Sequence, residues 1–196
     1  MKKRISIKWI ILIVVLALVV AFAVRLLFAI PFYPSFRKTA DSYENLRSKL
    51  KSAPVFLPDL SGLTLQNAEY RVLMDGRDIR ANKIGYEVYG DLPKEIVEDG
   101  SGVLTLHCTT KKSGIYRNLP DIYREIPIII RDDITASSDQ YICWQFALGK
   151  YEYTFATYYS IGGIDEETNA ALYETCSQQL QALTEQVIDQ YWDTQK

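Results

Sequence analysis

The most apolar stretch of the chain lies within its first 30 residues. Trp9 to Val24 contains no charged residue, and past Arg25 the apolar run continues to Ile30. About 20 apolar residues in a helix cross a hydrocarbon core, and an arginine near the end of such a span can extend its side chain to the headgroups. The pattern therefore predicts a transmembrane helix over residues 9–30.

Charges before this segment predict its orientation. No Asp or Glu occurs in the first 30 residues, and four basic residues lie among the first eight: Lys2, Lys3, Arg4 and Lys8. The positive-inside rule places residues 1–8 in the cytoplasm and the chain after Ile30 outside it. The localisation expected is a single-pass cell membrane protein that contacts the lipid bilayer through residues 9–30.

Two other readings of the apolar segment remain open. Ala21-Phe22-Ala23 is a candidate processing site of a cleaved signal peptide, which would release a secreted domain. Apolar residues continue for seven positions beyond Ala23, which favours an anchor over cleavage. A buried helix of a cytosolic protein is the second alternative, and the basic flank argues against it.

A connector is expected between the membrane segment and the folded domain. Ser35 is a suitable N-cap for a juxtamembrane helix that runs to about Lys51. Two residue–proline pairs follow, and the residue before a proline favours extended backbone. The sequence thus predicts a juxtamembrane helix and connector over residues 31–61 and an extracytoplasmic domain over residues 62–196.

The alternation of apolar and polar residues beyond this connector has the period of two that is typical of half-buried strands. Asp75-Gly76 and Gly90-Asp91 mark turns, so the first two strands are expected to form an antiparallel hairpin. Pro127 must lie at an edge or a bulge. Strands are expected over residues 68–74, 84–90, 103–109, 126–130, 140–148 and 151–160.

The last two of these strands show the clearest hairpin pattern. A tight turn at Gly149-Lys150 would pair Leu148 with Tyr151, Phe146 with Tyr153 and Trp144 with Phe155. Large apolar side chains would then lie together on one face of the hairpin. That face requires an apolar partner.

The C-terminal segment supplies this partner as an amphipathic helix. Acidic residues from Asp165 to Glu167 suit a helix N-terminus, and the helical pattern runs to about Trp192. Its apolar stripe has spacings of three and four residues: Leu172, Cys176, Leu180, Leu183, Val187 and Tyr191. The predicted fold class is α+β, with an antiparallel sheet of five or six strands packed by this long helix.

Composition supports one folded, acidic domain. Hydrophobic residues make up 48% and charged residues 23% of the chain, so disorder is not expected. Five of the 22 basic residues and none of the 24 acidic residues lie in the first 30 positions, which leaves 17 against 24 and a formal charge of −7 for the rest. Such a charge repels polyanions and argues against nucleic-acid binding.

Cysteine usage predicts neither a disulfide framework nor a metal site. Cys108, Cys143 and Cys176 allow at most one intramolecular disulfide, and small buried hydrophobic residues are the simpler interpretation. The chain contains one His and no CxxC pair, so we expect no zinc site and no other cofactor. Phosphate-loop, GxSxG and EF-hand spacings do not occur.

The only histidine lies beside a cysteine, at His107-Cys108. Thr105, Leu106, Cys108 and a later Arg117 partly resemble the signature of sortases, which are N-terminally anchored cysteine transpeptidases with a β-barrel fold. The resemblance would imply Cys108 as nucleophile and Arg117 as its arginine. The sequence departs from the signature because sortases need a further Thr before the cysteine and take their histidine from an upstream strand.

Strand geometry argues against a catalytic pair at this position. Neighbouring side chains on a strand point to opposite faces, so His107 and Cys108 cannot hydrogen-bond with each other. Cys108 shares its face with apolar residues and is expected in the core, whereas His107 is expected to face solvent. A pairing of His107 with Cys143 or Cys176 stays open. An envelope enzyme that uses Cys108 or His107 is therefore the alternative function.

Tyrosines on the polar faces of the strands are the remaining functional feature. The chain has 14 Tyr, and Tyr89, Tyr141 and Tyr158 fall on polar-alternating faces. Amphipathic rings suit a protein or glycan partner, although tyrosine also favours strands for structural reasons. The function expected is a non-catalytic binding or accessory domain of the cell envelope, with these three residues as its partner-binding surface.

Overall fold

The structure of the chain is a computed structural model that describes residues 13–22, 36–51, 53–74, 85–98, 102–110 and 121–196. The chain divides into two compact units, Met1–Pro34 and Ser35–Lys196. The second unit holds ten elements: β1 (Phe36–Ala40), α2 (Tyr43–Leu50), β2 (Gln66–Met74), β3 (Gly85–Asp91), β4 (Val103–Thr109), β5 (Asp121–Tyr123), β6 (Ile126–Ile134), β7 (Asp139–Leu148), β8 (Tyr151–Ser160) and α3 (Glu166–Asp193).

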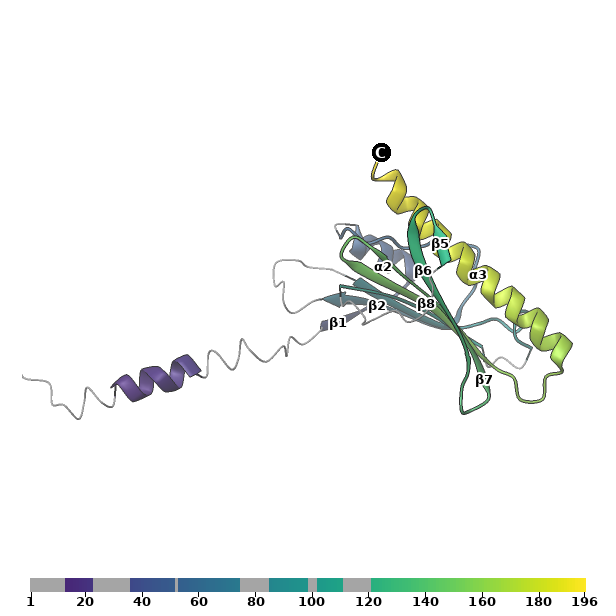
Figure 1. Cartoon of the computed structure of the whole chain (residues 1–196), viewed down its shortest axis with the longest axis horizontal. Helices are drawn as coiled ribbons and strands as arrows, with labels where there is room; N and C mark the ends of the chain where they lie inside the picture. The colour runs from purple at the N-terminus through teal and green to yellow at the C-terminus, as the bar shows by residue number, and fades with distance from the viewer. Residues whose placement is uncertain (1–12, 23–35, 52, 75–84, 99–101, 111–120) are drawn as a thin grey trace, which may run out of the picture. The chain divides into compact units, whose positions relative to one another are not determined.

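The strands form one antiparallel sheet of eight strands in the order β1-β2-β3-β4-β8-β7-β6-β5 (Figure 1). The α+β class is confirmed, but the expected number of five or six strands was too low. β1 and β5 account for the difference. Each is a short edge strand without a clear period of two, so pairing with a neighbouring strand decides its conformation rather than local sequence.

The β7–β8 hairpin has the predicted register. Leu148 pairs with Tyr151, Phe146 with Tyr153 and Trp144 with Phe155. Gly149 in the turn has φ of 59°, a left-handed conformation that glycine adopts without the steric cost of a Cβ. The Phe146 and Tyr153 rings stack with centroids 5.0 Å apart. The glycine turn and the aromatic pairs therefore favour the same register of the hairpin.

Helix α3 packs across one face of the sheet, as the apolar stripe predicts (Figure 1). The Asp165 side chain caps its N-terminus by accepting a hydrogen bond from the Thr168 amide at 2.8 Å. The residues that α3 buries are Cys176, Leu180, Leu183, Thr184, Val187 and Ile188. Leu172 and Tyr191 at the ends of the predicted stripe are partly buried against the same core.

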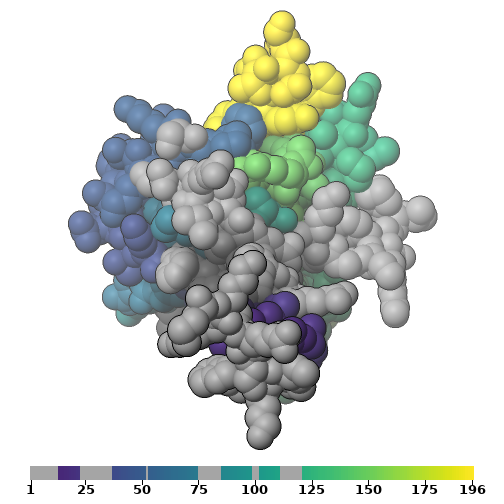
Figure 2. All heavy atoms as spheres, turned by 90° about the vertical axis from the view of Figure 1, so that its left-hand side faces the viewer, coloured from purple at the N-terminus to yellow at the C-terminus, as the bar shows by residue number. Residues whose placement is uncertain are grey.

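The C-terminal end of α3 lies beside the β5–β6 turn (Figure 2). Arg124 Nε is 2.8 Å from Asp189 Oδ1, and Trp192 Nε1 donates a hydrogen bond to the Arg124 carbonyl oxygen at 2.9 Å. The Tyr123 hydroxyl also donates to Asp189. These polar contacts hold the short edge strand β5 against the end of the helix.

From Phe36 onward, the segment expected as a juxtamembrane helix and connector lies in the second unit. The predicted helix from Ser35 to Lys51 was partly wrong: residues 36–40 form β1 on the edge of β2, and only Tyr43–Leu50 is helical, capped by Ser42. Leu46 and Leu50 are buried in the core. Both described helices of this unit therefore lie on the same face of the sheet.

The irregular segment that follows α2 packs against the core. The Phe56 amide donates a hydrogen bond to the Tyr153 hydroxyl at 3.1 Å, and the Tyr86 hydroxyl donates to the Phe56 carbonyl oxygen at 2.8 Å. Leu60 is buried in the same core. Two buried tyrosines of the sheet thus satisfy the backbone of an irregular segment, as buried polar groups require.

The first unit contains a helix over residues 13–22, within the predicted membrane segment. The rest of residues 9–30, and with it Trp9, Arg25 and the Ala23 processing site, lies outside the described residues. Among the residues that are described, no helix combines the length and the apolar character needed to span a membrane. The described helix exposes its large apolar side chains, up to 67% for Phe22.

Candidate functional site

The sheet face turned away from α3 gathers most of the charged side chains of the strands. We call it the outer face. Strand alternation places on it the residues that do not join the core, and the observed register aligns them across the sheet. Its charged and aromatic members are Arg37, Glu69, Arg71, Glu87, Tyr89, Asp91, His107, Arg131, Asp133, Asp139, Tyr141, Glu152 and Tyr158.

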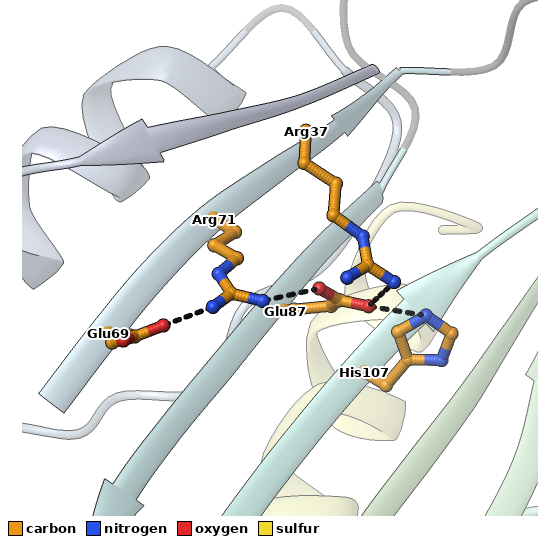
Figure 3. A network of polar contacts seen from close by, with 5 residues as sticks. All are labelled: Arg37, Glu69, Arg71, Glu87 and His107. Atoms are coloured by element: carbon orange, nitrogen blue, oxygen red, sulfur yellow. Dashed lines mark hydrogen bonds and ion pairs between the residues drawn. The ribbon is translucent and has the colours of Figure 1, made fainter. Parts of the chain in front are cut away.

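Glu87 on β3 is the centre of an ion-pair network on this face (Figure 3). Its side chain is only 5% exposed. Its Oε1 lies 3.3 Å from Arg37 Nη2 and 3.7 Å from His107 Nε2, and its Oε2 lies 3.9 Å from Arg71 Nη1. Arg71 also pairs with Glu69. Four neighbouring strands thus contribute to one network around a buried carboxylate.

Strand register explains why these side chains meet. Arg71, Glu87 and His107 lie directly opposite one another on β2, β3 and β4, and Arg37 reaches in from the edge strand β1. A buried carboxylate is tolerated when basic groups pair with it. Period-two patterning assigns Arg71 and Glu87 to polar faces, but the long connection between Met74 and Gly85 leaves their register unspecified. Local sequence patterns therefore do not reveal this network.

Burial is the main influence on the pKa of His107. Its side chain is 38% exposed, and desolvation lowers the pKa of the imidazole below its ordinary value. The nearby carboxylates of Glu87 and Glu152 oppose this effect, and Arg37 adds to it. His107 is therefore a weaker base here than a fully solvated imidazole.

The three tyrosines predicted as a partner-binding surface lie on the outer face, on β3, β7 and β8. We call Tyr89, Tyr141 and Tyr158 the tyrosine strip. The rings of Tyr141 and Tyr158 stack with centroids 5.4 Å apart, and Tyr158 is 36% exposed. The Arg71 guanidinium lies 5.3 Å from the centroid of the Tyr89 ring. The strip thus joins the Glu87 network through Arg71.

Two acceptor atoms on the outer face are buried and have no hydrogen-bond donor among the described residues: Glu87 Oε2 and Gln145 Oε1. Both residues lie in one lateral row of the sheet, with His107 and Thr154 between them. The Gln145 amide nitrogen donates to Thr154 Oγ1 at 3.4 Å. Glu87 Oε2 still faces the Arg71 guanidinium at 3.9 Å, so Gln145 Oε1 is the acceptor of this row that most favours a further hydrogen-bond donor.

The candidate catalytic cysteine lies on the opposite side of the sheet. Cys108 is fully buried among core residues, and burial raises the pKa of its thiol far above the ordinary value. A thiol in this state is a poor nucleophile. His107 points to the outer face, so strand geometry separates the two residues as expected. Arg117 lies outside the described residues.

The other two cysteines do not complete a catalytic pair with His107. Cys176 is buried on α3 at the core face, and Cys143 is buried on β7, two strands away from His107 in the sheet order. All three cysteines are free thiols. Among the described residues, no group of three or more His, Cys, Asp or Glu side chains is placed to hold a metal ion.

A cleft of about 560 Å³ lies away from the outer face, between residues 95–98 and the first turns of α3. Apolar side chains such as Ile96 and Leu172 line it, and its charged residues are Glu95, Glu98 and Asp165. Asp165 is already engaged as the helix cap. No general base or nucleophile is paired with these carboxylates in the described part of the cleft, so we place the candidate site on the outer face.

Comparison with known proteins adds no function to this geometry. No protein-family model matches the chain, and neither a curated protein nor a solved structure matches it significantly. The functional argument therefore rests on the residues of the outer face.

Proposed function

We propose that this chain is a single-pass membrane protein whose extracytoplasmic domain binds a protein of the cell envelope through its outer face. The observation that carries the proposal is the meeting of the tyrosine strip with the Glu87 network on one sheet face. Tyrosine and arginine are the residues most enriched at the energetic centres of protein interfaces. The domain acts in this proposal as a non-catalytic binding module.

The apolar N-terminal segment supports the membrane assignment. The described helix over residues 13–22 has apolar side chains on all sides, and they are exposed. A helix that is hydrophobic all round requires an apolar environment, which a bilayer supplies. Basic residues before the segment favour a cytoplasmic N-terminus and a domain on the outside.

Protein rather than glycan is the partner that the outer face fits better. A neutral glycan would use the tyrosine rings, but it would offer no charged group to the charged side chains that surround them on this face. A protein surface supplies charged and aromatic groups together. The secreted form and an envelope enzyme stay alternatives, and the buried thiol of Cys108 argues against the enzyme.

Site-specific photocrosslinking in the native cells tests the proposal. A photoreactive residue at position 158 should yield one discrete adduct, identified by mass spectrometry, that forms again from the two purified proteins. The same residue in place of Ala182, exposed on α3, is the matched control and should yield none. A Cys108→Ala change should leave the adduct from position 158 intact.

Three results would contradict the proposal. Equal adducts from positions 158 and 182 would mean that the outer face has no special role. Adducts that glycosidases but not proteases remove would mean a glycan partner. Loss of the adduct in the Cys108→Ala variant, with unchanged thermal stability, would favour an enzyme.

A further inference from the structure

We infer that the partner of the outer face presents a cationic segment, with arginine or lysine side chains that dock along the tyrosine strip. This inference rests on the proposed function and names the chemistry of its partner. Charge, unpaired hydrogen-bond acceptors and exposed aromatic rings all point to the same ligand class.

Charge on the outer face is unbalanced toward the acidic side. Among the described residues of this face, and leaving His107 aside, six carboxylates face three guanidinium groups, which gives a formal charge of −3. The domain as a whole is also acidic, because 24 acidic residues face 17 basic ones after residue 30. A second copy of this domain or a polyanion would be repelled, whereas a basic segment would be attracted. The carboxylates are Glu69, Glu87, Asp91, Asp133, Asp139 and Glu152, and the guanidinium groups are Arg37, Arg71 and Arg131.

One lateral row of the sheet has a carboxylate at each end and two stacked rings between them. Asp133 pairs with Tyr141, Tyr141 with Tyr158, Tyr158 with Val103, and Val103 with Asp91. This row crosses five strands, so Asp133 and Asp91 lie about 19 Å apart at the usual strand spacing. Two cationic side chains on one extended segment can reach both carboxylates.

The hydrogen-bonding groups of the outer face also favour a cationic partner. Gln145 Oε1 is a buried acceptor without a hydrogen-bond donor among the described residues, and Glu87 Oε2 has only the longer contact of 3.9 Å with Arg71 Nη1. Lys and Arg side chains carry donors only, so they satisfy such atoms and add none that need a partner. Arg37, whose side chain is 56% exposed at the sheet edge, already pairs with Glu87 at 3.3 Å, which shows that a cationic side chain fits beside this carboxylate.

The tyrosine rings provide a third reason. Arg71 already lies over the ring of Tyr89 at 5.3 Å, which shows that this face accommodates a guanidinium on an aromatic ring. Tyr158 is more exposed than a core residue and lies in the same row as Asp91 and Asp133, two strands from each of them. Cations bind to tyrosine faces with about 0.5–1 kcal/mol at exposed sites.

Binding of a defined peptide to the full chain in nonionic detergent micelles tests the inference. The probe has two arginines at each end of a neutral spacer that keeps the ends roughly 19 Å apart when extended. The same peptide with citrulline in place of arginine keeps the shape and removes the charge. With a neutral dye on each peptide, fluorescence anisotropy should show binding of the arginine form only, weakened by added salt.

Variants of the chain identify the residues that bind the arginine peptide. Asp91→Asn with Asp133→Asn removes two charges from the row and should weaken the arginine peptide about tenfold. Glu166→Gln with Glu174→Gln removes two charges from the exposed surface of α3 and should change the affinity less than twofold. Thermal unfolding of both double variants checks that they remain folded, since Asp91 accepts a hydrogen bond from Asn67 at 2.6 Å and Glu166 lies in the first turn of α3.

The inference is overturned if the wild type does not bind the arginine peptide, if citrulline binds equally well, or if both double variants weaken binding alike. Its failure is distinct from that of the proposed function. A partner could still crosslink at position 158 while its affinity does not depend on salt. In that case the outer face is an interface, but the partner does not present a cationic segment.

Discussion

His107 and Cys108 are neighbours on β4 and lie in different environments. Successive side chains of a strand point to opposite faces, so Cys108 enters the apolar core while His107 meets the carboxylate of Glu87. Burial raises the pKa of the Cys108 thiol and lowers the pKa of the His107 imidazole, because desolvation disfavours the charged form of each. One peptide unit thus separates a structural thiol from a titratable group of the outer face.

Stability of the domain should fall on acidification because of His107. The unfolded imidazole takes up a proton near its ordinary pKa of about 6.5, whereas the folded one, with a lower pKa, does so only at lower pH. The contribution of His107 is therefore complete above about pH 6.5 and is lost as pH falls through its folded pKa. Urea unfolding of residues 35–196 at several pH values measures the free energy of unfolding.

The matched variant is His107→Gln, which removes the only histidine of the chain. Its stability should follow a flatter profile just below pH 6.5, so that the wild-type advantage shrinks as pH falls. A wild-type advantage that grows instead would show that Glu87 and Glu152 raise the pKa of His107 above its ordinary value. In that case burial would not be the dominant influence on the pKa of His107.

At the scale of elements, close approach between β3 and β4 depends on one glycine. A Cβ at Gly85 would collide with the backbone carbonyl oxygen of Cys108 on β4. A backbone atom in the middle of a sheet cannot move aside as the end of a flexible side chain can. The two strands that carry Glu87 and His107 therefore need a residue without a side chain at this position.

Gly85→Ala should destabilise the domain by about 2 kcal/mol or more, because the strands must separate to admit the methyl group. Gly62→Ala is the matched control, since a Cβ there meets no atom within 4 Å. Urea unfolding of both variants gives the comparison. Equal stability of the two variants would mean that β3 and β4 are less closely packed at this point than described.

At the scale of the whole molecule, the chain consists of an apolar N-terminal unit and an acidic folded unit. The folded unit has its own core between the sheet, α2 and α3. In the proposed topology, the apolar unit anchors the acidic unit at the membrane. The predicted topology is consistent with this arrangement and has a direct test.

Protease added to intact cells should digest the folded unit and leave a membrane-bound fragment that begins at Met1. The expectation follows from the basic residues before the apolar segment, which favour a cytoplasmic N-terminus. Mass determination of the membrane-bound fragment gives its first residue. A protected domain would reverse the orientation, and a product that begins near Val24 would mean signal-peptide cleavage and a secreted domain.

Local patterns in the sequence determined much of this fold. Period-two alternation located six strands, Gly149-Lys150 determined the register of the β7–β8 hairpin, and the apolar stripe located α3. Each of these features depends on residues close together in the chain, where backbone geometry dictates which side chains share a face. The same alternation places Tyr89, Tyr141 and Tyr158 on the polar faces of their strands.

Tertiary structure alone decided the rest. β1 and β5 are strands because a longer strand offers them an edge, and the network around Glu87 exists because register brings Arg37, Arg71 and His107 beside it. Pairing between strands separated by long connections depends on contacts distant in sequence, which no local pattern encodes. The sequence by itself determined which residues face outward, and only the pairing of the strands determined which of them meet.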